Sequence, residues 1–193
     1  MTLSPEEAAR ANFYALLARL FYAPPDGVLL EALAGADEIE AAGGDLGPAW
    51  RDLSSAAAAA TDAKVKEEYD AAFIGTGKAP VTLYTCAYSI RYTNEAPLAQ
   101  LRGELSRLGF VRRADSSEPE DHIAALCEVM RHLIAEQKTE LAVQRAFFAA
   151  WIQLAAEPLC NAITGYEPTR FYRAVARFAK AFLDLEQEAF QLV

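Results

Sequence analysis

Residues 118–122 read EPEDH and place three carboxylates and one of the chain's two histidines within five positions. Carboxylates accept strong, often bidentate hydrogen bonds from guanidinium groups, and a histidine can gain or lose a proton near neutral pH. Directly after them, Ile123, Cys127, Met130 and Ile134 recur at helical spacing. The acids and the histidine therefore stand at the start of a predicted helix, where they could bind a cationic partner.

Helix capping explains most of this stretch. Ser117 is expected to cap the helix and Pro119 to occupy its first turn, while the acids meet the positive end of the helix dipole. On a wheel of 100° per residue, His122 falls at the border of the apolar stripe and Asp121 points away from the core. Capping leaves His122 without a role, and the pair would lie between core and water, where a partner could touch both.

Catalytic and metal sites find little support in the sequence. Cys86 or Ser89 could act as a nucleophile with His122 as base, although their spacing does not select them among the other cysteines and serines. Two histidines and dispersed cysteines are too few for a zinc site. The GTGK segment at 75–78 precedes Ala79, where a phosphate-binding loop needs serine or threonine. We expect a protein that is not an enzyme, with no metal and no cofactor.

Apolar residues recur with a period near 3.6 in almost every segment, and none shows a convincing period of two. Helices are expected to begin near Pro5, Asp26, Pro48, Asp62, Asn94, Pro119, Leu141 and Pro168. Pro158 should end or kink the helix that begins near Leu141. The aromatic segment 75–93 lacks helical periodicity and is interpreted as a loop, because no second strand is visible to pair with it. The predicted fold class is all-α.

Charge and composition exclude several partner classes. The chain has 27 acidic and 18 basic residues and a pI near 4.8, whereas nucleic acids and anionic membranes require a basic face. Three scattered cysteines are typical of reduced thiols. No apolar run approaches the roughly 20 residues that cross a bilayer, and the N-terminus lacks a secretion signal. We expect a cytoplasmic protein without nucleic-acid partner or membrane insertion, in which Arg112 and Arg113 belong to a solvated loop.

Taken together, these residues resemble the TorD and DmsD family of redox-enzyme maturation chaperones, to which the NarJ type is related. EPEDH matches every fixed position of the family's E-P-x-D-H motif, including the spacing into an apolar helix. YALLARLFYAPPDGVLLEAL, EYDAAFIGTGKAPVTLYTCAYS and LAQLRGELSRLGF are similar to the first helix, the segment leading to a tyrosine-bearing loop, and the helix before the motif. Many members carry an acid and a serine after the loop tyrosine, where this chain has Thr85 and Cys86, a departure that concerns the identity of the client.

The resemblance implies a single all-helical domain of two lobes, at about 1–110 and about 120–193, joined by a hinge near residues 110–120. It implies a cytoplasmic chaperone that binds the twin-arginine signal peptide and the apoprotein of a molybdenum oxidoreductase of the DMSO reductase type. Such a chaperone assists insertion of the molybdopterin cofactor into its client and prevents premature export, without catalysing a reaction. The family includes monomers and dimers that exchange lobes.

A twin-arginine leader carries two guanidinium groups followed by an apolar stretch, so its receptor needs acceptor carboxylates beside a hydrophobic groove. Glu118 and Asp121 are the candidate acceptors, and aromatic side chains are candidates for the groove. The expected signal-peptide-binding residues are Glu118, Pro119, Asp121, His122, Tyr22, Phe73, Pro80, Tyr84 and Tyr88. The alternative function is a helical scaffold or assembly factor that binds a folded subunit and does not recognise a signal peptide.

Overall fold

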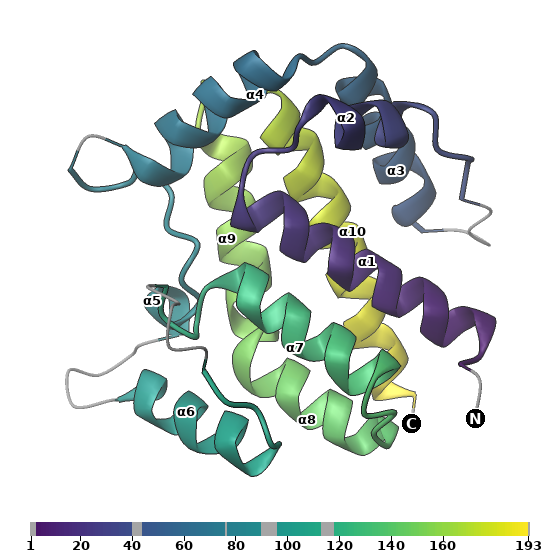
Figure 1. The fold of residues 1–193 in the computed structure, drawn as a ribbon, viewed down its shortest axis with the longest axis vertical. Helices are drawn as coiled ribbons and strands as arrows, with labels where there is room; N and C mark the ends of the chain where they lie inside the picture. Colours follow the sequence, from purple (N-terminus) through teal and green to yellow (C-terminus); the bar gives the residue numbers. More distant parts are fainter. Residues whose placement is uncertain (1–2, 40–43, 76, 90–95, 113–117, 193) are drawn as a thin grey trace. The chain divides into compact units, whose positions relative to one another are not determined.

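The computed structural model describes residues 3–39, 44–75, 77–89, 96–112 and 118–192, and within these ranges it contains helices and no β-strand (Figure 1). The elements are α1 (Pro5–Tyr22), α2 (Gly27–Ala34), α3 (Leu46–Ala58), α4 (Asp62–Tyr69), the π-helix η1 (Asp70–Ile74), α5 (Cys86–Ser89), α6 (Pro97–Arg107), α7 (Ile123–Ala135), α8 (Leu141–Trp151), α9 (Gln153–Gly165) and α10 (Phe171–Gln191). The all-α fold class predicted from the sequence is confirmed.

The chain forms two compact units. Unit 1 comprises Met1–Ala18 and Leu83–Ala155, and unit 2 comprises Arg19–Thr82 and Ala156–Val193. Each unit draws on segments that lie far apart in the sequence. The two lobes and the hinge expected from the sequence stay a prediction, and residues 113–117 of that hinge lie outside the described ranges.

Unit 1 contains α7 and α8 side by side (Figure 1). The buried residues of α7 follow the predicted stripe and widen it: Ile123, Ala124, Leu126, Cys127, Met130, Leu133 and Ile134. Phe147 and Phe148 on α8 are buried in the core, whereas Trp151 is half-buried. Burial of one face of α7 gives the residues that precede this helix a fixed support.

The helix α6 is joined to α7 through the turn that follows it. Gly109 has a φ of 82°, the left-handed conformation predicted for the residue after this helix. Phe110 then packs its ring against His132 of α7, with ring centroids 5.3 Å apart. Gln137 also donates a hydrogen bond to the carbonyl of Leu108 at 3.0 Å. The expected cap Asn94 lies outside the described residues, and α6 begins at Pro97.

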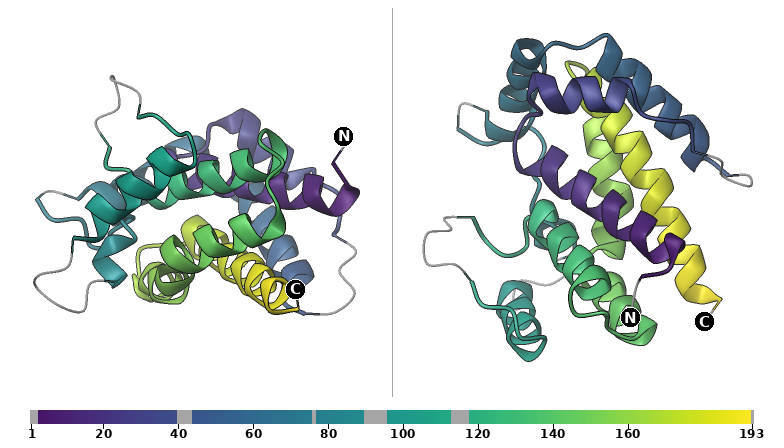
Figure 2. Two further views of the ribbon diagram at one scale, coloured as in Figure 1. Left: turned by 90° about the horizontal axis from the view of Figure 1, so that it is seen from below. Right: turned by 45° about the vertical axis from the view of Figure 1, so that its right-hand side comes forward.

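Unit 2 packs α3 against both α2 and α10 (Figure 2). The helix α2 begins after Asp26 as predicted, and Asp26 caps it, because its side chain accepts a hydrogen bond from the N–H group of Leu29 at 2.9 Å. Trp50 on α3 contacts Phe178 on α10, with ring centroids 5.3 Å apart. The amphipathic faces recognised in the sequence are thus buried against one another.

The break after α8 falls at Ile152, before the proline that was expected to cause it. Pro158 lies inside α9, so the expectation that it ends a helix is wrong, and the alternative that it kinks the helix stays a prediction. A proline within a helix removes one backbone hydrogen bond, and the surrounding helix persists here despite that loss. No single helix in the described part of the chain meets the length and hydropathy required to cross a membrane, although the bent pair α8 and α9 together would.

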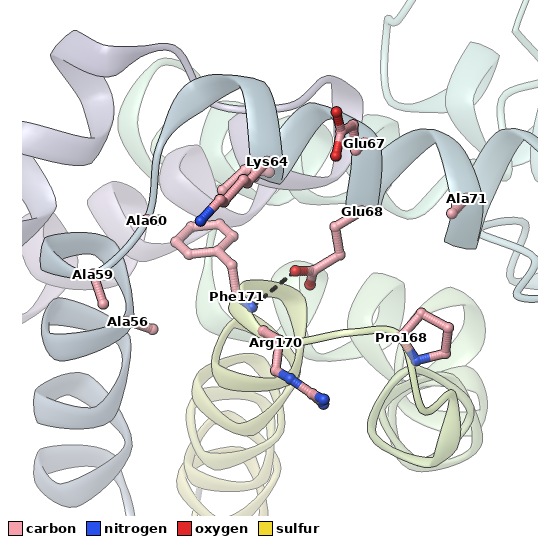
Figure 3. A pocket seen from close by; sticks show the side chains of 11 residues that line it. Ala56, Ala59, Ala60, Lys64, Glu67, Glu68, Ala71, Pro168, Arg170 and Phe171 are labelled. Atoms are coloured by element: carbon pink, nitrogen blue, oxygen red, sulfur yellow. Dashed lines mark hydrogen bonds between the residues drawn. The ribbon is translucent and has the colours of Figure 1, made fainter.

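A side chain from α4 caps the N-terminus of α10. Glu68 accepts hydrogen bonds from the backbone N–H groups of Phe171 and Tyr172 at 3.1 and 2.6 Å, and Figure 3 shows the contact between Glu68 and Phe171. The residue at the cap position, Arg170, forms no capping bond with its own side chain. A carboxylate at this place satisfies unpaired amides and meets the positive end of the helix dipole.

Replacing Glu68 with glutamine should lower the free energy of unfolding by about 1–3 kcal/mol, because charge-assisted hydrogen bonds at the start of α10 are lost. Denaturant unfolding followed by circular dichroism measures the change. Glu67→Gln is a matched control one residue away on the exposed face of α4, and should stay within about 0.5 kcal/mol of the wild type. Equal losses in the two variants would contradict the capping role of Glu68.

Candidate functional site

The residue that caps α7 is His122. Its Nδ1 accepts a hydrogen bond from the backbone N–H of Ala124 at 3.2 Å, and the helix begins at Ile123. The residues from Glu118 to Asp121 precede the helix and form a turn. The expectation that the helix starts earlier, with Pro119 in its first turn, is therefore wrong. Ser117, the expected cap, lies outside the described residues.

Asp121 is buried, with only 5% of its surface exposed, and the expectation that it points away from the core is wrong. Its carboxylate accepts a hydrogen bond from the backbone N–H of Cys86 at 3.3 Å. Its carbonyl oxygen accepts from the N–H and the hydroxyl of Thr85, at 2.9 and 3.2 Å. The helical wheel misplaced Asp121 because this residue precedes the helix, where the rotation of 100° per residue does not apply.

The tyrosine-bearing loop pairs with the motif through its backbone. Tyr84 and His122 form an isolated antiparallel β-bridge, and the N–H of Ile123 donates to the carbonyl of Leu83 at 2.8 Å. The rings of Tyr84 and His122 meet edge to face, with centroids 5.4 Å apart. The described part of segment 75–93 is largely a loop, as predicted, but it contains the short helix α5, and its pairing partner is the motif itself.

Glu118 is exposed, and it is held by the loop tyrosine. The hydroxyl of Tyr84 donates a hydrogen bond to Oε2 of Glu118 at 2.5 Å. This bond raises the pKa of Tyr84 to about 12, with burial and the charges of Glu118 and Asp121 contributing less. The phenol therefore remains protonated at neutral pH and keeps donating to Glu118. The half-buried Pro119 restricts the backbone directly after this carboxylate.

Glu120 lies between two arginines. Nε of Arg102 on α6 is 3.0 and 3.1 Å from the two carboxylate oxygens, and Nη1 of Arg112 is 3.5 Å from Oε1. The pKa of Glu120 is lowered, chiefly by the hydrogen bond with Arg102. Glu120 is not among the binding residues expected from the sequence, because the family motif leaves its third position open. Only the folded chain brings Arg102 to it across 18 residues.

Burial shifts the pKa values of His122 and Cys86 toward their uncharged forms. Burial is the main cause that lowers the pKa of His122, and the nearby charges of Glu118 and Asp121 partly oppose it. Burial, followed by the charge of Asp121, raises the pKa of the Cys86 thiol to about 12. A thiol in this state is a poor nucleophile at neutral pH, which disfavours the catalytic role considered for Cys86. Nothing is described for the side chain of Ser89.

The remaining predicted binding residues divide between the two units. Tyr88 is half-buried on α5 of unit 1. In unit 2, Tyr22 is 67% exposed at the end of α1, and Pro80 is exposed, whereas Phe73 on η1 is buried. The ring of Phe73 packs against Tyr69 at a centroid distance of 5.1 Å. The structure thus brings Glu118, Pro119, Asp121, His122 and Tyr84 together within unit 1, and a joint role with the unit 2 residues stays a prediction.

A separate hollow of about 530 Å³ lies on unit 2 among α3, α4 and the start of α10 (Figure 3). Alanines, Val65 and Phe171 supply apolar lining, and charges of both signs surround it, including Lys64 and Glu67. A helix N-terminus can bind an anion through its free amides. Here Glu68 already occupies the first two amides of α10, so they are not free for a ligand.

His122 should make the stability of the protein depend on pH. The cap requires an unprotonated Nδ1, and burial lowers the folded-state pKa of His122 below the usual 6.5. The stabilisation is therefore complete above the unfolded-state pKa and is lost as the pH falls through the folded-state pKa. In His122→Asn, where an amide oxygen can still cap, this part of the slope should disappear between about pH 7 and pH 5.

Denaturant unfolding at several pH values measures this slope. His132→Asn is the matched control, because it removes the chain's other histidine and should keep the slope due to His122. The same pH dependence in the wild type and in His122→Asn would contradict the assignment.

Comparison with known proteins supplies the family. Residues 40–161, which are 122 of the 193 residues, match the sequence model of the family described as nitrate reductase delta subunit. The chain is 29% identical over 135 aligned positions to chaperone protein TorD of Aliivibrio salmonicida (strain LFI1238), covering 64% of this chain and 62% of that relative. It is 27% identical over 207 aligned positions to chaperone protein TorD of Shewanella loihica (strain ATCC BAA-1088 / PV-4), covering 96% of this chain and 95% of that relative.

The matched region includes the EPEDH motif and α7, so the likeness extends over the site described above. The chain spans slightly less than two thirds of the first relative and almost the whole length of the second. These matches confirm the resemblance seen in the motif and in the ordered segments around it. The chain belongs to the nitrate reductase delta subunit family, which includes the TorD-type redox-enzyme maturation chaperones.

Proposed function

We propose that this protein is a cytoplasmic chaperone that binds the twin-arginine signal peptide and the apo form of a molybdopterin-dependent oxidoreductase of the DMSO reductase type. Membership of the TorD-type family supports the broader role of a redox-enzyme maturation chaperone. In the proposed role the protein assists cofactor insertion into the client and delays export until insertion is complete. The observation that carries signal-peptide binding is the exposed Glu118 carboxylate, held by Tyr84 on a buried support.

Glu118 has the chemistry that a guanidinium requires. An ionised carboxylate has about four acceptor positions on its two oxygens, so the single bond from Tyr84 does not exhaust its capacity. A client arginine can therefore approach Glu118 while Tyr84 keeps the carboxylate in place. Binding to a carboxylate that is already oriented reduces the conformational entropy lost when the peptide binds.

Asp121 and His122 act on the peptide indirectly. Both are buried, with 5% and 7% of their surfaces exposed, and their polar atoms bind the backbone of the loop and of α7. They position Tyr84, which forms the backbone bridge with His122, and through its hydroxyl they position Glu118. Tyr88, Tyr22, Phe73 and Pro80 remain the proposed contacts for the apolar stretch of the signal peptide.

The function is tested by purifying the tagged protein from its native cytoplasm while molybdoenzymes are expressed, and identifying what accompanies it by mass spectrometry. We expect an uncleaved precursor that carries a twin-arginine leader. Addition of a synthetic leader peptide should release this precursor, whereas a peptide with both arginines replaced by glutamine should not. Recovery of folded, leaderless subunits alone would favour the alternative of a scaffold or assembly factor.

Substitutions of the two motif acids should separate direct contact from support. Glu118→Gln should weaken binding of a synthetic twin-arginine peptide by about 1–3 kcal/mol and leave the unfolding free energy within about 0.5 kcal/mol of the wild type. Asp121→Ala should weaken both peptide binding and folding by about 1–3 kcal/mol, because the N–H of Cys86 loses a buried acceptor. Titration calorimetry and denaturant unfolding measure the two effects.

Glu128→Gln is the matched control for both variants, because Glu128 is exposed on α7 and pairs with Arg131 on the same helix. This control should leave the peptide affinity unchanged. An unchanged affinity in Glu118→Gln would show that another carboxylate binds the client arginine. A loss of binding without a loss of stability in Asp121→Ala would instead assign direct contact to Asp121.

A further inference from the structure

The motif already holds a guanidinium group that belongs to this chain. Nη1 of Arg112 lies 3.5 Å from Oε1 of Glu120, and Nη2 of the same side chain donates to the backbone carbonyl of Glu118 at 3.2 Å. Arg112 thus spans two residues of the EPEDH stretch, next to the carboxylate proposed to bind a client arginine. The chemistry of this contact is the chemistry expected of a twin-arginine leader.

We propose that Arg112 is an internal competitor, which occupies the motif in the free protein and is displaced by an arginine of the signal peptide. The inference rests on the proposed function and adds a regulation of the same site. Displacement exchanges one guanidinium for another at Glu120 and at the carbonyl of Glu118, so no charge at the motif is left unpaired. A cationic ligand must therefore displace Arg112 before it can bind, which disfavours weak and non-specific ligands.

Of the two arginines that contact Glu120, Arg112 is held less closely than Arg102, as the proposed exchange requires. Arg102 contacts both carboxylate oxygens at 3.0 and 3.1 Å from a regular helix, whereas Arg112 makes the longer contact of 3.5 Å. The Arg112 side chain is 40% exposed, in contrast to 12% for Glu120. The Arg112 side chain is open to solvent and its contact is long, and ion pairs at the surface contribute little to stability, so a peptide arginine can replace Arg112 at small cost. Arg102 remains and keeps Glu120 oriented.

Removal of the competitor should strengthen binding. Arg112→Gln should raise the affinity for a synthetic twin-arginine signal peptide about two- to fivefold. The peptide then no longer has to break the ion pair between Arg112 and Glu120 in order to bind. In a Glu120→Gln background the same substitution should have a clearly smaller effect, since the ion pair is already lost and only the hydrogen bond to the carbonyl of Glu118 remains. Titration calorimetry with the four proteins gives the coupling between Arg112 and Glu120.

Arg107→Gln is the control for the change in net charge. Arg107 pairs with Glu104 within α6, so its removal changes the field felt by a cationic peptide without touching the motif. An increase in affinity of equal size in Arg107→Gln and Arg112→Gln would overturn the inference in favour of general electrostatics. An affinity that is unchanged or lower in Arg112→Gln would also overturn it.

The outcome for the wild type separates this inference from the function on which it rests. If the wild type binds the peptide and Arg112→Gln binds it no better, only the internal competition is refuted. If neither protein binds the peptide, signal-peptide recognition and the internal competition are both refuted. Binding that is detected only after removal of Arg112 would support both.

Discussion

The arrangement of the site depends on the burial of Asp121. A carboxylate removed from water is costly unless hydrogen bonds compensate it, and here the N–H of Cys86 supplies one. The backbone carbonyl of Asp121 accepts two further hydrogen bonds, both from Thr85. These contacts join the tyrosine-bearing loop to the residue before the cap of α7. Because the loop is tied to the helix at this point, Tyr84 and Glu118 are brought within hydrogen-bond distance of each other.

Three acids within four residues have three different environments, and the roles proposed for them rest on this difference. Asp121 is buried among backbone groups, Glu120 is paired with arginines, and Glu118 is exposed beside a phenol. A guanidinium from outside the chain can reach the exposed carboxylate directly, and can reach the paired one only by exchange. In the proposed function the buried acid serves as support. The spacing of the acids in the sequence is compatible with all of these roles and distinguishes none of them.

The protonation states around the motif disfavour nucleophilic chemistry by Cys86. Burial lowers the pKa of His122, so its ring stays neutral and its Nδ1 remains available to cap α7. Burial raises the pKa of the Cys86 thiol to about 12, and the bond to Glu118 raises that of Tyr84 to a similar value. Tyr84 and Cys86 therefore keep their protons, and Nδ1 of His122 keeps the lone pair that accepts the capping hydrogen bond. The hydrogen bonds that these groups make are thereby constant near neutral pH.

The sequence by itself determined the features that depend on neighbours along the chain. Helical periodicity located the stripe of α7, an aspartate marked the start of α2, and Gly109 marked the end of α6. The family motif could also be recognised in the sequence, because its residues are contiguous. The tertiary structure decided the partners that lie far apart in sequence, such as Glu68 with α10, Arg102 with Glu120, and Tyr84 with Glu118. The tertiary structure also decided that Asp121 is buried and that His122 is the cap. A residue outside a helix follows no helical period, so its environment depends on the distant segment that packs against it.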